Sequence, residues 1–206
     1  MKIRVSFFAG LVFLLGLSIL LTIYVAWLIY PLEIQWLGLT ELVSLSAQTI
    51  VKNFSILMTY LTNPFNWTLR MPDFASSADG LYHFEAVKKL FHLAQGVTLV
   101  ALVISIPFLK VIKKNCSGRA FAKGFLVMAL APIFLAIFAS GIGFSRFFVL
   151  FHQVLFPGDT TWLFHPDLDP VIKILPETYF LHCFILFFII YEGLFLFTYL
   201  KLKTFR

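Results

Sequence analysis

Long apolar runs separated by polar segments divide this chain into four predicted membrane-spanning helices. Each run is long enough to cross a hydrocarbon core about 30 Å thick, because a helix rises about 1.5 Å per residue. The runs cover residues 5–30, 94–112, 124–145 and 179–200. The pattern therefore predicts an all-α, polytopic membrane protein in which residues 1–206 form a single membrane domain.

The first outer segment, residues 31–93, is far longer than a simple turn requires. Within it, residues 36–61 place apolar side chains at close to helical spacing, with polar residues between them. This spacing predicts one or two amphipathic helices that lie in the membrane interface. Asn63 and Pro64 end the pattern and begin a loop.

A further helix is predicted to begin before the second span and to continue into it. Ser77 or Asp79 is suited to cap its N-terminus, so we expect His83 to lie on exposed first turns. Helical geometry points His92 to nearly the opposite face. These two histidines therefore cannot serve one site together.

The composition excludes a water-soluble globular domain, since 60% of the residues are hydrophobic and 13% are charged. Basic residues favour the cytoplasmic side of short membrane flanks. We therefore predict that both termini are cytoplasmic and that residues 31–93 and 146–178 are extracytoplasmic. The residues behind this orientation are Lys2, Arg4, Lys110, Lys113, Lys114, Arg119, Lys123, Lys201, Lys203 and Arg206. The net charge of +6 then meets anionic headgroups, and no nucleic-acid partner is expected.

Two histidines enter the outer side from the ends of adjacent spans. His83 lies at the start of the second span, and His152 lies about two turns beyond Arg146, where the third span ends. Because an imidazole titrates near neutral pH, such a pair can pass protons during chemistry on a lipid. The alternative is that each histidine only forms hydrogen bonds with a headgroup or water.

Other chemistries find less support in the sequence. A zinc site could use His83, His152 and either Asp167 or Asp169 as ligands. These residues do not follow any recognisable ligand spacing, so we predict no metal. A serine hydrolase would need a Gly-x-Ser-x-Gly turn, and none occurs.

Three further positions are candidates for supporting roles. Arg146 is expected either to extend towards headgroups or to bind a phosphate or ester oxygen. Trp162 and Asp167 belong to a segment rich in Trp, Asp and Pro that we predict to form a structured lid. Glu192 lies inside the fourth span, where an ionised carboxylate is costly, and its role stays open.

Two outer motifs together resemble the signature regions of the bacterial lipoprotein intramolecular transacylase (Lit) family, and the similarity spans most of the chain. The first motif is His83-Phe84-Glu85-Ala86-Val87-Lys88-Lys89-Leu90-Phe91. The second is Phe151-His152-Gln153-Val154-Leu155-Phe156, followed by Trp162, Pro166-Asp167, Pro176-Glu177 and Phe180. Ala86 stands where the family often has aspartate, so the resemblance implies that any role of that carboxylate is absent or falls to Glu85.

The resemblance implies a reaction on diacylglyceryl-modified bacterial lipoproteins in the cell membrane. The sn-2 acyl chain would move to the α-amine of the N-terminal cysteine, with no external acyl donor and no cofactor. It also implies that His83 and His152 are the catalytic pair, one as base and the other as proton donor. Which histidine takes which role, and whether an acyl-imidazole forms, is left open.

The competing class is a non-enzymatic membrane module, such as an assembly subunit or a lipid-binding accessory protein. It accounts for the hydrophobicity and topology but not for the paired motifs. A transporter fits the sequence less well than either of these classes, because four spans are few for alternating access and because only one ionisable residue, Glu192, lies well inside a predicted span. The sequence does not predict an oligomeric state.

Overall fold

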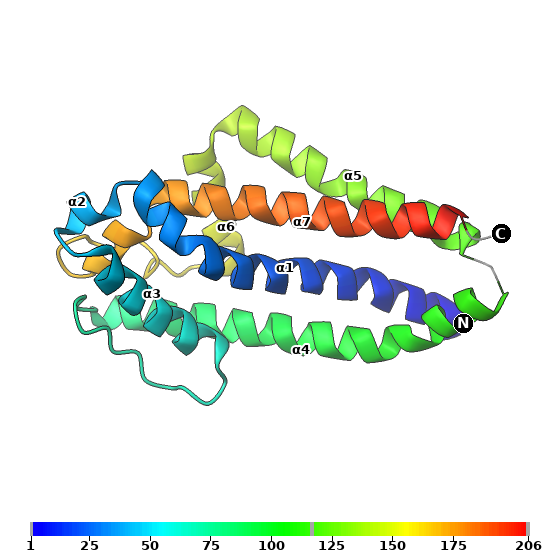
Figure 1. Cartoon of the computed structure of the whole chain (residues 1–206), viewed down its shortest axis with the longest axis horizontal. Coiled ribbons are helices and arrows are strands. Elements are labelled where there is room, and N and C mark those ends of the chain that lie inside the picture. Colours follow the sequence, from blue (N-terminus) through cyan, green and yellow to red (C-terminus); the bar gives the residue numbers. More distant parts are fainter. Residues whose placement is uncertain (1, 116–117, 205–206) are drawn as a thin grey trace. The chain divides into compact units, whose positions relative to one another are not determined.

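The computed structural model describes residues 2–115 and 118–204, and in this part of the chain all regular structure is helical (Figure 1). The prediction of an all-α fold is confirmed. The elements are α1 (Lys2–Trp36), α2 (Leu39–Val43), α3 (Ala47–Thr62), α4 (Ala78–Asn115), α5 (Arg119–Ile142), α6 (Phe144–Leu155), the 3₁₀ helix η1 (Pro170–Ile174) and α7 (Glu177–Thr204). Arg206, which entered the orientation argument, lies outside the described residues, as do the side chains of Lys2, Lys113 and Lys114.

Four of the described helices, α1, α4, α5 and α7, are long and apolar enough to cross a membrane. They contain the four predicted spans, but three of them extend beyond the predicted bounds at both ends. α4 begins at Ala78, well before the predicted start of the second span at residue 94. The extension follows from the polar first turns of α4, which hydropathy alone does not count as part of a span.

Contacts group the described residues into two compact units, while the prediction of one membrane domain over residues 1–206 stays a prediction. Unit 1 comprises the described parts of 1–23, 93–142 and 184–206, and unit 2 comprises 24–92 and 143–183. α1, α4 and α7 contribute to both units.

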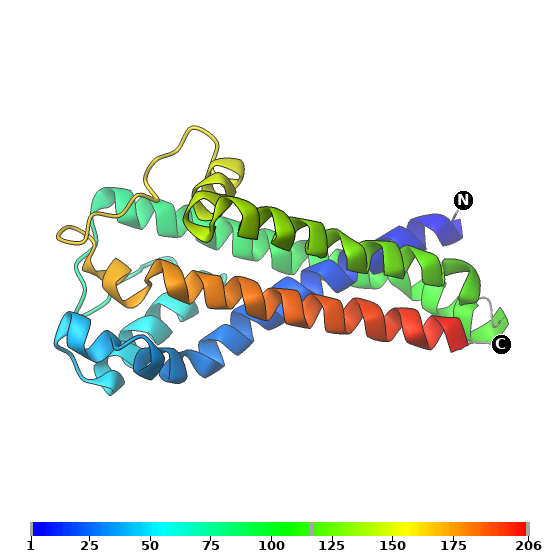
Figure 2. The same ribbon diagram turned by 90° about the horizontal axis from the view of Figure 1, so that it is seen from above.

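Unit 1 is a bundle of the N-terminal part of α1, the C-terminal parts of α4 and α7, and α5 (Figures 1 and 2). Its core joins Leu11, Phe108, Phe125 and Phe195, one from each of these helices. The Ser6 hydroxyl donates to the Ile104 carbonyl at 2.7 Å and accepts from the Phe108 N–H at 2.9 Å. It thereby bridges backbone groups of α4 beside Pro107, where the helical hydrogen-bond ladder is interrupted.

For residues 36–61, where one or two helices were predicted, unit 2 has the two helices α2 and α3. Gly38, at φ 61°, separates α1 from α2, and the Ser46 side chain caps α3 by accepting the Thr49 N–H. One face of α3 is buried, and there Phe54 stacks on Tyr30 of α1 with 3.5 Å between ring centroids. The Tyr30 hydroxyl donates to the Ile174 carbonyl, which ties α1 to η1.

The third span ends earlier than predicted. α5 stops at Ile142, and Gly143 adopts φ 83°, a conformation that side-chain-bearing residues rarely adopt. The chain then starts α6 at Phe144 instead of continuing one helix beyond Arg146. A single glycine therefore separates the span from the helix that carries His152.

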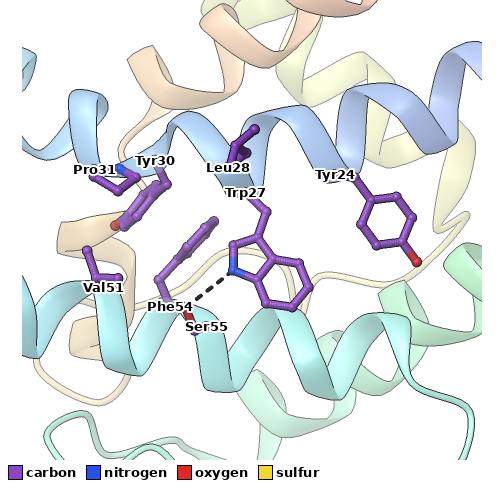
Figure 3. Close-up of a pocket in the computed structure, with 8 residues that line it drawn as sticks. All are labelled: Tyr24, Trp27, Leu28, Tyr30, Pro31, Val51, Phe54 and Ser55. Carbon is purple, nitrogen blue, oxygen red and sulfur yellow. Dashed lines mark hydrogen bonds between the residues drawn. The ribbon is translucent and has the colours of Figure 1, made fainter.

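A shallow apolar groove of about 340 Å³ lies between α1 and α3 in unit 2 (Figure 3). Its polar feature is a hydrogen bond from Trp27 Nε1 to Ser55 Oγ at 3.3 Å. The lining residues are Tyr24, Trp27, Leu28, Tyr30, Pro31, Val51, Phe54 and Ser55, and no histidine is among them.

Candidate active site

His83 lies in the second turn of α4, which starts at a serine cap. The Ser77 hydroxyl oxygen accepts the Gly80 N–H at 2.9 Å, so Ser77 and not Asp79 caps the helix. The expectation that His83 is exposed is wrong, since only 6% of the residue is accessible. Its Nδ1 atom is buried and has no hydrogen-bond partner in the part of the chain that the structure describes.

His152 lies in the last turn of α6 and is half-buried. Its Nδ1 is 2.8 Å from the Phe148 carbonyl oxygen. Because a carbonyl only accepts, Nδ1 must carry the proton, and in the neutral ring Nε2 is the basic nitrogen. Burial lowers the pKa of His152 below its usual value, and the Phe148 hydrogen bond acts in the opposite direction.

The structure brings the two predicted histidines together within unit 2. Their ring centroids are 6.0 Å apart. Phe156, at the end of α6, contacts both rings, with centroid distances of 4.9 Å to His83 and 6.1 Å to His152. The ring centroid of Phe164 lies 5.5 Å from that of His83, with the two rings nearly perpendicular. The pair therefore lies in an aromatic, poorly hydrated surrounding that explains why His83 is buried.

The 157–169 loop follows α6 (Figure 2). It contributes Trp162 to the site. The indole stacks on His152 at 4.7 Å with an interplanar angle of 26°. Its Nε1 donates to the Asp159 carbonyl at 3.0 Å, which holds the ring in place. Trp162, which the sequence assigned to a structured lid, thus packs against His152 in the structure.

Asp159 is an acidic residue of the site that the sequence argument missed. The Thr161 N–H donates to Asp159 Oδ1 at 2.8 Å, and this hydrogen bond lowers the pKa of the carboxyl, which keeps it ionised. The carboxylate interacts electrostatically with His83. The turn Pro157-Gly158, directly after the helix of His152, was a signal that the chain returns towards the histidine here.

The other three predicted supporting residues are all exposed. Glu85 is exposed and forms an ion pair with Lys89 at 2.7 Å. Arg146 is exposed near the start of α6. Asp167 is exposed, and its closest ionisable neighbour is His165, with 3.8 Å between Oδ2 and Nδ1.

The residues considered for zinc do not converge. Asp169 accepts two hydrogen bonds from Ser77, so its carboxylate is already engaged at the start of α4. Within residues 2–115 and 118–204, no group of three or more His, Cys, Asp or Glu side chains is arranged to hold a metal ion.

Two buried ionic groups in unit 2 were not predicted. Glu33 of α1 is 2% exposed, and its Oε2 lies 2.7 Å from His182 Nδ1 of α7. His182 of α7 therefore pairs with α1. Lys88 of α4 is 1% exposed and donates to the carbonyls of Tyr60, Asn63 and Asn66.

This arrangement is suited to proton transfer. His152 presents a basic Nε2 with its other nitrogen held by a carbonyl. His83 presents an unpartnered nitrogen in a poorly hydrated site, where its interactions with a polar reactant are strengthened. The aromatic wall has the apolar character that a lipid substrate requires.

Comparison with known proteins points to one family. The model of the family "Lipoprotein intramolecular transacylase Lit" matches residues 4–180. A structure of the membrane integral lipoprotein intramolecular transacylase Lit from Bacillus cereus shares 28% identity, covering 97% of this chain and 92% of that chain, with a TM-score of 0.87. The same Bacillus cereus protein with a histidine replaced by alanine matches at 27% identity over 99% of this chain and 91% of that chain, with a TM-score of 0.82. A search of curated protein sequences gave no significant match.

Proposed function

The chain belongs to the lipoprotein intramolecular transacylase Lit family and is thus a multi-pass membrane acyltransferase, and we propose that it moves the sn-2 acyl chain of diacylglyceryl-cysteine to the α-amine of the same cysteine. The product is a lyso-form lipoprotein that keeps one acyl chain on glycerol and carries the other on nitrogen. The family assignment also removes the alternative of a non-enzymatic accessory subunit.

The observation that carries the proposed site is the pair of facing imidazoles, His83 and His152, in an aromatic surrounding. An amine that attacks an ester must lose a proton, and the leaving alkoxide must gain one. With 6.0 Å between their ring centroids, the two imidazoles are close enough for one bound reacting group to contact both. This spacing supports a direct transfer in which both histidines act on one bound substrate.

We assign the base role to His152. Its Nδ1–H is held by the Phe148 carbonyl, so Nε2 is available to take the proton of the attacking amine. Two features stabilise the imidazolium that forms: the same carbonyl and the C-terminal end of α6.

His83 then acts on the acyl oxygen or on the departing glycerol oxygen. In the overall reaction an N–C bond forms, the ester C–O bond breaks, and one proton of the neutral amine ends on the glycerol hydroxyl. His83 is desolvated and starts neutral, which suits a group that donates a hydrogen bond to developing oxygen charge. In the covalent variant, an imidazole nitrogen first takes the acyl group and the ester C–O bond breaks, and the α-amine of the same lyso-glyceryl cysteine then attacks the acyl-imidazole and releases the imidazole.

Substitution of the two histidines tests the proposal. We expect His83→Ala and His152→Ala each to abolish N-acylation of a model lipoprotein in cells that lack other N-acylating activity. Mass spectrometry of the N-terminal lipopeptide gives the answer, since intramolecular transfer leaves the total mass unchanged while fragments place one acyl group on the amine. His165→Ala is the matched control, because this histidine lies in the 157–169 loop with its side chain exposed.

Full activity of either histidine variant, with protein present in the membrane at wild-type level, would overturn the assignment of the pair. A lipopeptide that stays diacylated on glycerol in the presence of the wild-type chain would overturn the reaction itself. An acyl-protein adduct in a trapped reaction would replace direct transfer by the covalent route.

A further inference from the structure

Asp169 is a buried carboxylate that the proposed chemistry does not use. Only 3% of the residue is exposed, and no cation pairs with it among the described residues. The Ser77 N–H donates to Oδ1 at 2.8 Å, and the Ser77 hydroxyl donates to Oδ2 at 2.7 Å. Burying an unpaired charge is costly, so these hydrogen bonds and the positive end of α4 must offset the cost.

This contact joins the end of the 157–169 loop to the start of the helix that carries His83. Ser77 caps α4 through Gly80, and His83 follows three residues later on the same helix. On the other side, the Asp169 N–H donates to the His165 carbonyl at 2.8 Å, directly after Phe164, whose ring packs on His83.

The loop is therefore held at both ends. Its first end is fixed by α6, because the Phe156 N–H donates to the His152 carbonyl at 2.8 Å. Its second end is fixed by Asp169. Between these points the loop presents Trp162 to His152 and the Asp159 carboxylate to His83.

Gly80 gives an independent sign that α4 is adapted to this contact. A β-carbon at Gly80 would overlap Oδ1 of Asp169 and lie 2.8 Å from Cγ. Glycine is otherwise unfavourable in the first turns of a helix compared with alanine. The close approach of the carboxylate accounts for a glycine at this position.

We propose that Asp169 and Ser77 form a latch that positions the 157–169 loop, and with it Trp162 and Phe164, against the His83–His152 pair. The residues of the latch are positioning residues, since they act through the loop and do not touch the reacting atoms. This inference rests on the proposed function only in its activity test.

The decisive experiment compares two glycine-to-alanine substitutions in α4. Gly80→Ala displaces the Asp169 carboxylate, whereas a β-carbon at Gly96 meets no atom within 4 Å. Helix propensity alone predicts that both variants are at least as stable as wild type. The latch predicts that kcat falls by about 100-fold in Gly80→Ala, with KM within a few-fold of wild type, and that Gly96→Ala keeps wild-type kinetics.

Ser77 allows a rescue test. A purely structural role of Ser77 does not predict that its substitution lowers kcat while KM stays unchanged. Ser77→Ala removes the hydroxyl that donates to Oδ2, whereas Ser77→Thr keeps it. We expect Ser77→Ala to lose kcat and Ser77→Thr to retain it. Asp169→Asn, which loses one acceptor oxygen, should behave as Ser77→Ala does.

Amide hydrogen exchange reports the position of the loop without any substrate. In Gly80→Ala, we expect faster exchange of amides in residues 157–169 and unchanged exchange in the rest of unit 2. Equal exchange and equal kcat in the Gly80 and Gly96 variants would overturn the latch. If the wild-type chain shows no transacylase activity but Gly80→Ala still has faster exchange in residues 157–169, the latch is supported and the proposed function is overturned. Failure of the latch and failure of the proposed function are therefore distinguishable.

Discussion

Individual residues in this site acquire their chemistry from one or two neighbours. The Phe148 carbonyl selects the tautomer of His152, and Trp162 covers one face of the same ring. His83 has the opposite situation, with an unpartnered nitrogen among aromatic rings. Two residues of one type thus differ in which nitrogen is available and in how well each is hydrated, which is the basis for assigning them different roles.

The pH dependence of turnover follows from the environment of His152. As the base, it must be neutral, and burial holds its pKa below the usual 6.5. The acidic limb that His152 contributes to the turnover profile should therefore have its midpoint below pH 6.5. Among the described residues, His83 from α4 is an ionisable group whose ring faces His152, and the Asp159 carboxylate of the loop interacts with His83.

Trp162→Ala provides the companion measurement. Removing the stacked indole hydrates His152, so its pKa rises towards 6.5 and the acidic limb of the kcat profile moves to higher pH. A wild-type limb above pH 6.5, or a limb that does not move in the variant, would contradict the role of His152 as a desolvated base.

At the scale of elements, α4 connects the parts of unit 2 that surround His83. Its first turn binds Asp169, its second turn carries His83, and its third turn carries Lys88. The Lys88 ammonium donates to three carbonyls at 2.6 to 2.7 Å, one in the last turn of α3 and two in the segment that follows it. It also lies 4.6 Å from the Tyr60 ring centroid. Lys88 therefore attaches α3 to α4 (Figure 1).

Neighbouring lysines on α4 give a matched test of this attachment. We expect Lys88→Ala to lower the free energy of unfolding by about 2 kcal/mol or more, because three carbonyls lose a charged donor. Lys89→Ala should change it by less than about 0.5 kcal/mol, since its pair with Glu85 is exposed and follows helical i, i+4 spacing. Chemical denaturation in detergent measures both values, and equal losses would show that Lys88 does not hold α3.

At the scale of the whole molecule, four apolar helices and the family match define a multi-pass membrane protein. Its orientation remains our proposal, based on the basic segments around the spans. With both termini in the cytoplasm, the residues of unit 2 that surround the histidine pair belong to the extracytoplasmic side. This placement fits a substrate whose modified cysteine lies at the outer surface of the membrane.

Cysteine labelling in intact cells tests the orientation. After Cys116 and Cys183 are replaced by alanine, Thr160→Cys should react with a membrane-impermeant maleimide in intact cells. Lys123→Cys should react only after the membrane is permeabilised. Both positions are exposed, so access to the label depends on the side of the membrane. The reverse pattern would invert the topology.

Local patterns in the sequence were sufficient for the helical fold, the four spans, the amphipathic helices near residues 36–61 and the two histidines. Each of these depends on the spacing of apolar residues, on caps or on short motifs, which neighbouring residues determine. The tertiary structure decided which polar residues matter. It selected Asp159 and Asp169 over Asp167, and it buried Lys88 while leaving Lys89 exposed.

It also decided that His83 is buried and that the basic nitrogen of His152 is Nε2. Burial of His83 depends on Phe156 and Phe164, which lie more than 70 residues away along the chain. The number of partners that a polar group finds, and the water it loses, are set by segments that meet only after folding. Helical spacing therefore located the histidines, but long-range packing assigned their chemistry.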